Sequence, residues 1–194
     1  AAVTANPYES SYKFTNNATV VSGTVYYFKV EPIRWRILST DGETALIICD
    51  SIIANQAYDS SSNNYAESDI RAWLNATFYE TAFTSLQRDI ILTTTVDNSV
   101  YSTGYSSNSY ACEDTEDKIF LLSYREVTNS DYGFSTSSST DDTARRMQTS
   151  DYSRATGAYM STGSSIYYGN GWWWLRSPGS TSDYAAEITT VGYV

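Results

Sequence analysis

The sequence predicts an α+β fold with a mostly antiparallel, twisted sheet, two or three short helices and long polar loops. Short stretches rich in β-branched and aromatic residues are typical of strands, and between them the apolar spacing changes to the 3.6-residue period of a helix. No internal repeat is present. With 194 residues, the chain is expected to form an irregular N-terminal segment over 1–22 and one domain over 23–194.

Strands are expected wherever short apolar runs end at turn-forming residues. The clearest pair is a hairpin over 33–38 and 44–49, because Asp41 and Gly42 form a turn signal between the two runs. The other expected strands cover 24–30, 118–122, 172–176 and 184–191.

The best-defined helix is expected to begin at Ser68 or Asp69, because Ile70, Trp73 and Phe78 fall on one side of a helix. Two capping boxes predict further helical turns. The additional expected segments are 84–92 (Thr84 with Gln87), a turn after Ser123 (with Glu126), and 143–157.

Charge and composition exclude several kinds of partner. The net charge is −10, which repels a phosphate backbone, so nucleic acid is not an expected partner. No stretch approaches the roughly 20 apolar residues that span a bilayer, so the chain is not expected to be membrane-embedded. Charged residues make up only 18%, and hydroxyl-rich runs such as 60–64 and 135–140 favour an extracellular or cell-surface location.

The sequence offers no conventional catalytic group. Histidine is absent, which removes the commonest general base and metal ligand. The carboxylates show no spacing that marks a glycosidase pair, so no catalytic residue is predicted. Two cysteines, Cys49 and Cys112, form either a disulfide or two free thiols; two residues give no framework pattern that decides between them.

One acidic run is a candidate metal site. Glu113, Asp114, Glu116 and Asp117 place four carboxylates within five residues, enough oxygen ligands for a calcium ion if the loop curls around it. The spacing of an EF-hand is missing, and a solvated acidic loop is the alternative.

Four segments together resemble a known family: 31–38 (EPIRWRIL), 69–75 (DIRAWLN), 117–123 (DKIFLLS) and 173–179 (WWLRSPG). They are similar to a bacterial family of unknown function found on surface and secreted proteins, often of gut Gram-positive bacteria. The resemblance extends from about Val25 to Val191. Members usually continue to a Gly-Val-Arg-Pro-like ending, whereas this chain stops at Val194, so the chain is either truncated or lacks the closing strand.

The resemblance implies a C-type-lectin-like fold, which also underlies formylglycine-generating enzymes and phage-type variable receptor-binding proteins. Lectin-like domains often carry calcium, so the resemblance adds support to a calcium site at the acidic run. The kinship to formylglycine-generating enzymes would require a reactive pair of cysteines, for which Cys49 and Cys112 are weak candidates.

The tryptophan run is the first candidate ligand-binding feature. Trp173 and Trp174 form either a sugar platform or part of the core, and the family resemblance favours the core. Trp172 is then the best candidate for an exposed ring. Arg176 is expected to pair with a carboxylate; the candidates are Glu187, Asp183 and Asp69.

Long polar loops supply the remaining candidates, because loops of this kind often carry function. The predicted binding surface covers 98–112, 129–142 and 164–172. Its candidate ligand-binding residues besides Trp172 are Tyr167, Tyr168, Tyr105 and Tyr110.

These observations predict a non-catalytic binding module that recognises a carbohydrate or a protein partner at the bacterial surface, as part of a larger multidomain protein. The alternative is a structural or assembly domain of a surface protein. An enzyme is the third hypothesis, and it would require clustered carboxylates or paired cysteines in a deep pocket.

Overall fold

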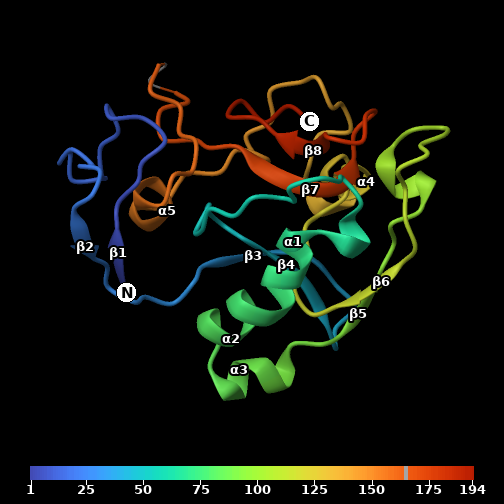
Figure 1. The fold of residues 1–194 in the computed structure, drawn as a ribbon. Coiled ribbons are helices and arrows are strands. Elements are labelled where there is room, and N and C mark those ends of the chain that lie inside the picture. The colour runs from blue at the N-terminus through green and yellow to red at the C-terminus, as the bar shows by residue number, and fades with distance from the viewer. Residues whose placement is uncertain (164–165) are drawn as a thin grey trace. The chain divides into compact units, whose positions relative to one another are not determined.

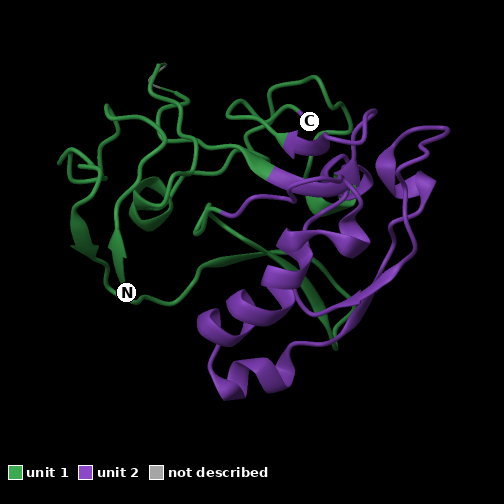
Figure 2. Cartoon of the chain, viewed as in Figure 1, with its two compact units in different colours: residues 1–55, 130–173, 188–193 green, residues 56–129, 174–187, 194 purple. Residues whose placement is uncertain are grey.

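The structure, a computed structural model, describes residues 1–163 and 166–194. This part of the chain divides into two compact units (Figure 2). Unit 1 comprises residues 1–55, 130–173 and 188–193, and unit 2 comprises residues 56–129, 174–187 and 194. The α+β class is confirmed, but the described strands form four separate two-stranded sheets instead of one larger sheet.

Unit 1 is built mainly from two antiparallel strand pairs and one short helix (Figure 1). Its elements are β1 (Ala2–Thr4), β2 (Val25–Tyr27), β3 (Trp35–Thr40), β4 (Ala45–Cys49), η4 (Ser130–Tyr132) and α5 (Asp151–Ala155). The predicted hairpin is confirmed as β3 paired with β4. Its turn forms because the Asp41 carboxylate accepts hydrogen bonds from the Glu43 and Thr44 backbone amides at 2.9 and 2.7 Å, while Gly42 adopts a φ of +96°.

The N-terminal segment contains more structure than the sequence predicts. Residues 2–4 form strand β1, which pairs with β2. Tyr12, Phe14 and Val20 are buried with Met160 in one core cluster of the unit. Long-range pairing and burial therefore order a segment whose polar composition predicts irregular chain.

The helix predicted over 143–157 is wrong for its first half, since only α5 forms. The backbone before it makes bridges instead: Thr149 pairs with Ile52, and Gln148 pairs with Asn170. Met147 lies in a second core cluster, against which Trp173 packs. Tertiary pairing thus replaces the local helix over these residues.

Unit 2 carries most of the helices. Its elements are η1 (Tyr65–Glu67), α1 (Asp69–Trp73), the π-helical turn η2 (Leu74–Phe78), α2 (Tyr79–Ala82), α3 (Ser85–Ile90), β5 (Thr94–Val96), η3 (Val100–Thr103), β6 (Thr115–Asp117) and α4 (Tyr124–Val127). The helix start is confirmed at Ser68, whose side chain caps α1 by accepting from the Arg71 amide. Both predicted capping boxes are present, at the starts of α3 and α4. No helix within the described residues is long and apolar enough to cross a lipid bilayer.

The strand predicted over 118–122 is wrong, and a side chain explains why. The amides of Lys118 and Ile119 donate to Asn75 Oδ1 at 2.8 and 3.2 Å, and Asn75 Nδ2 donates to the Ile119 carbonyl at 2.9 Å. These backbone groups are satisfied by Asn75 and need no neighbouring strand. The strand lies earlier, as β6, which pairs with β5.

The tryptophan strand is confirmed as β7 (Trp173–Pro178), which pairs with β8 (Ala185–Ile188). Trp174 packs against the core of unit 2, whose buried members include Tyr58 and Tyr65. Because Trp173 likewise packs against a core cluster of unit 1, the core alternative for these two rings is confirmed.

Candidate binding surfaces

Trp172 belongs to a row of three aromatic rings on unit 1. Its indole stacks on Tyr159, with the ring centroids 4.4 Å apart and the planes 30° apart. Tyr8 meets the Tyr159 ring edge-on, with the ring centroids 5.4 Å apart. Trp172 is 44% exposed and Tyr8 is 62% exposed, while Tyr159, which contacts both rings, is half-buried. We call Tyr8, Tyr159 and Trp172 the aromatic row.

Buried contacts hold the aromatic row in place. Gly171, directly before Trp172, forms an antiparallel bridge with Met160, which follows Tyr159. The fully buried Tyr12 hydroxyl donates to the Met160 carbonyl at 3.0 Å and accepts from the Met160 amide at 2.7 Å. Burial raises the pKa of Tyr12 to about 12, so this phenol keeps its proton at neutral pH. The two stacked rings are therefore fixed before any ligand arrives.

Two exposed asparagines lie against the turn that leads to Tyr159. Asn55 Nδ2 donates to the Thr156 carbonyl at 3.1 Å. Gly157 follows with a φ of +100°, and a Cβ there would lie 3.1 Å from the Asn6 carbonyl and 3.3 Å from Asn55 Nδ2. Asn6 and Asn55, which are both exposed, thus lie against this turn, two residues before Tyr159.

Tyr167 and Tyr168 have different surroundings. The Tyr167 hydroxyl donates to Asp141 at 2.5 Å, and the Arg146 guanidinium lies 4.8 Å from the Tyr167 ring centre. The hydrogen bond from Arg146 lowers the pKa of Asp141, and the bond to Asp141 raises the pKa of Tyr167. Tyr167 is therefore engaged in a polar cluster, whereas Tyr168 is 41% exposed. Of the predicted surface over 164–172, residues 164–165 lie outside the described part of the chain.

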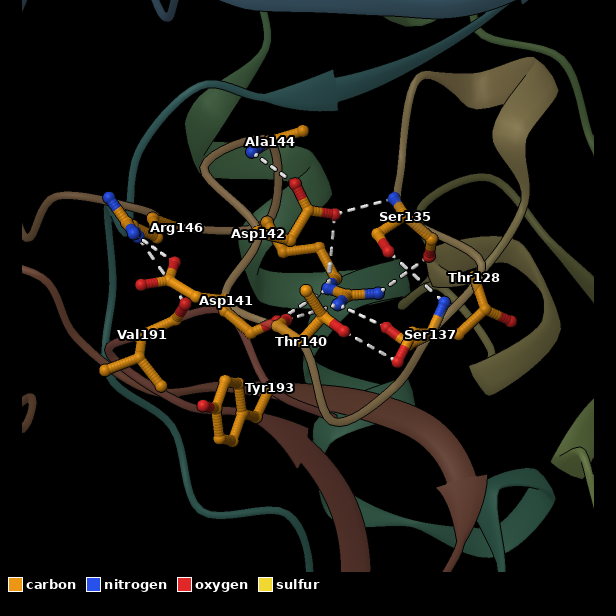
Figure 3. Close-up of polar contacts among 12 residues, drawn as sticks. Thr128, Ser135, Ser137, Thr140, Asp141, Asp142, Ala144, Arg146, Val191 and Tyr193 are labelled. Carbon is orange, nitrogen blue, oxygen red and sulfur yellow. Dashed lines mark hydrogen bonds and ion pairs between the residues drawn. The ribbon is translucent and has the colours of Figure 1, made fainter.

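The predicted loop over 129–142 is organised by a buried arginine. The fully buried Arg145 guanidinium donates to four backbone carbonyls, those of Ser135, Ser137, Thr140 and Gly192, at 2.6 to 3.1 Å. The Asp142 carboxylate lies 3.4 Å from Arg145 and accepts from the amides of Ser135 and Ala144 (Figure 3). This cluster uses its polar groups to stabilise the loop, which gives it a structural role.

Tyr105 and Tyr110 come together on unit 2. They line a surface depression of about 310 Å³ whose walls are Tyr105, Ser107, Asn108, Ser109, Tyr110 and Ser180. We call it the Tyr105 depression. Tyr105 is 50% exposed and Tyr110 is half-buried. The lining carries hydroxyls, one amide and two rings, but no carboxylate and no cationic side chain.

The four candidate calcium ligands do not gather. Asp117 is buried and pairs with Arg71 at 2.8 Å, whereas Glu116 is exposed on the same strand. Successive side chains of a strand point to opposite faces, so these two carboxylates diverge. Glu113 and Asp114 precede β6 and are exposed. Nowhere among residues 1–163 and 166–194 do three His, Cys, Asp or Glu side chains meet as metal ligands. The structure therefore adds no support to calcium binding, which stays a prediction from the sequence.

Both cysteines are free thiols, Cys49 in unit 1 and Cys112 in unit 2, which corresponds to the second of the two alternatives. Burial raises the pKa of each thiol, which disfavours the nucleophilic thiolate.

Arg176 has a partner that the sequence did not indicate. It forms an ion pair with Glu126 at 2.5 Å, so the expected pairing with Glu187, Asp183 or Asp69 is wrong. Arg176 is only 2% exposed, so this ion pair is buried on the arginine side. Its role is to join β7 to the start of α4 within unit 2.

Sequence reasoning also missed Tyr8 and Tyr159. Neither residue lies in a periodic stretch or beside another ring in the sequence. Their only link to Trp172 is contact in the folded unit 1, so no local pattern could have identified them.

These features define a small α+β protein with solvent-exposed aromatic surfaces. The chain belongs to a family described as a domain of unknown function (DUF6273), whose model matches residues 42–194. The expected membership of an uncharacterised domain family is thus confirmed. No curated protein and no solved structure matches the chain.

Proposed function

We propose that this chain is a non-catalytic binding module that recognises a carbohydrate through the aromatic row of Tyr8, Tyr159 and Trp172. The observation that carries the proposal is that Trp172, one ring of a stacked pair, is exposed. One face of the Trp172 indole is covered by Tyr159, yet the residue is 44% exposed, which leaves its other side available to a ligand. The face of a sugar ring presents C–H groups that complement the negative face of an aromatic ring.

The chemistry around the aromatic row suits a sugar better than an ion. Asn6 and Asn55, exposed residues at the turn before Tyr159, carry uncharged amides, a group that can both donate and accept hydrogen bonds. A net charge of −10 disfavours nucleic acids and other strongly anionic polymers. Rings held by buried contacts lose little conformational freedom when a ligand binds. An uncharged glycan therefore fits this surface.

The proposal includes a location and a fold. An exported module at the bacterial surface, within a larger protein, would meet glycans of the cell wall or of a host. The hydroxyl-rich, weakly charged composition supports this location. We also propose a C-type-lectin-like fold, supported by the sequence resemblance and by the mixture of short helices and antiparallel strand pairs.

Retention on insoluble polysaccharides tests the proposal. The purified chain is mixed with cellulose, chitin, xylan and peptidoglycan, and the bound fraction is measured for the wild type and for Trp172→Ala. At least one polysaccharide should retain the wild type, and Trp172→Ala should weaken retention about tenfold, the loss expected for one aromatic anchor. Tyr27→Ala is the matched control, because Tyr27 is 84% exposed on β2 and lies outside the aromatic row.

Circular dichroism and thermal melting first establish that each variant is folded. If the folded wild type is retained on none of these polysaccharides, or if Trp172→Ala is retained as well as Tyr27→Ala, the aromatic row is not a carbohydrate site.

A further inference from the structure

We propose that the Tyr105 depression of unit 2 is a second carbohydrate site, which holds a single uncharged sugar residue. This inference goes beyond the proposed function, which depends on unit 1 alone. It rests on the lining, the size and the rigidity of the depression.

The lining matches an uncharged, polyhydroxylated ligand. Ser107, Ser109 and Ser180 each offer a hydroxyl that can donate one hydrogen bond and accept two. Tyr105 and Tyr110 add ring surface on which the apolar face of a sugar can pack. Because no cationic residue lines the depression, a carboxylate placed there would lose hydration without gaining an ion pair. The site should therefore discriminate against acidic sugars.

The size of the depression restricts the ligand. Its volume of about 310 Å³ lies at the lower end of the range of roughly 300–1,000 Å³ for small-molecule sites. One sugar ring fits such a volume, whereas a segment of several rings needs an extended surface. The aromatic row and the Tyr105 depression thus suit different lengths of glycan.

Asn108 fixes the loop that forms one wall. Its Nδ2 donates to the carbonyls of Pro178 and Gly179 at 3.3 and 3.2 Å. Its Oδ1 accepts from the Tyr110 amide at 2.9 Å. Asn108 is therefore a positioning residue that ties the tyrosine loop to the turn after β7, where Ser180 lies.

Two glycines fix the same walls by close packing. Gly104, with a φ of +78°, lies so close to the Tyr124 ring that an added Cβ would overlap it. A Cβ on Gly179 would overlap the Tyr184 ring in the same way. Gly104 and Gly179 directly precede the lining residues Tyr105 and Ser180, so close packing restrains the backbone at both points. This restraint lowers the entropic cost of binding.

Ligand-detected NMR tests this site with defined monosaccharides. The full chain is titrated with methyl glycosides of glucose, galactose and N-acetylglucosamine, and with methyl glucuronide as the charged analogue. At least one neutral glycoside should bind, and the glucuronide should bind about tenfold more weakly or not at all. Tyr105→Ala should weaken binding of the neutral glycoside about tenfold, and Ser180→Trp, which fills the depression, should abolish this binding.

Two other variants keep this test separate from that of the proposed function. Trp172→Ala and Tyr27→Ala should both leave monosaccharide binding unchanged. Tyr105 is 50% exposed, so its truncation should leave the melting temperature close to that of the wild type even if Ser180→Trp fails to fold.

The outcomes are distinct. If no neutral glycoside binds the folded wild type, or if Trp172→Ala removes the signal while Tyr105→Ala retains it, the inference is overturned. A chain that is retained on no polysaccharide but shows the Tyr105-dependent signal would support this site and contradict the function proposed for the aromatic row.

Discussion

Replacing Arg176 with methionine should cost the protein a large part of its stability, although methionine keeps an unbranched apolar stem at this position. The guanidinium makes five hydrogen bonds: two to the Glu126 carboxylate, one to the Leu121 carbonyl and two to the Asp97 carbonyl. It also lies 5.8 Å from the centre of the Phe120 ring. A methionine can replace the packing but none of these bonds.

The size of the loss follows from burial. Removing one partner of a buried ion pair costs about 3–5 kcal/mol, because the other charge is left without compensation. The Glu126 side chain is 23% exposed and still accepts from the Ser123 amide at 2.7 Å, so it regains part of its solvation. We therefore expect the lower limit, about 3 kcal/mol, which for a chain of this size lowers the melting temperature by about 6–12 °C.

Arg34→Met is the matched control. Arg34 also faces a carboxylate, Asp50, but at 3.9 Å and with 85% of its side chain exposed. Exposed pairs contribute between about 0 and 1 kcal/mol, so this substitution should leave the urea midpoint nearly unchanged. Arg176→Lys, which keeps the charge without the bidentate geometry, should fall between the two.

Urea denaturation followed by tryptophan fluorescence, together with thermal melting, measures all three variants. Equal losses for Arg176→Met and Arg34→Met, or a loss below about 1 kcal/mol for Arg176→Met, would refute the argument that burial of the ion pair sets its contribution.

Two further substitutions test packing and titration. Gly171→Ala should destabilise the protein by about 1–3 kcal/mol, because its Cβ would lie 2.7 Å from Ile52 Cδ1 and from the Tyr159 carbonyl, whereas Gly163→Ala, in open space, should be nearly neutral in the same urea assay. A neutral result for both would show that Gly171 is not closely packed. Burial raises the pKa of the Glu187 carboxyl, so the folded protein binds this proton more tightly than the unfolded chain does. The resulting stabilisation is complete below the ordinary pKa of 4.5 and is lost as the pH rises through the raised pKa. Glu187→Gln should therefore raise the melting temperature at neutral pH and have little effect well below pH 4.5; an equal effect at both pH values would contradict this assignment.

Local signals predicted the elements that depend on neighbouring residues. The Asp41-Gly42 turn, the Ser68 cap and the capping box at Thr84 all form, because each is satisfied by side chains within a few positions of the backbone groups that they bind. The strand prediction over 118–122 was wrong because Asn75, far away in the sequence, accepts the hydrogen bonds of the Lys118 and Ile119 amides.

The candidate sites divide in the same way. Loop length and tyrosine content indicated Tyr105 and Tyr110, and the assignment of Trp173 and Trp174 to the core left Trp172 as the candidate for an exposed ring. The partners of these residues could not be predicted: Tyr159 reaches Trp172 through the bridge between Gly171 and Met160, which only the folded unit creates.

By itself, the sequence determined the α+β class, the family, the turn and capping chemistry, and the absence of histidine. Composition and short-range hydrogen bonds set these properties, and they do not depend on the path of the chain. Only the tertiary structure decided which rings meet, which carboxylate pairs with Arg176 and where a depression forms. Those contacts join residues many positions apart, and their energies depend on burial, which the folded chain alone defines.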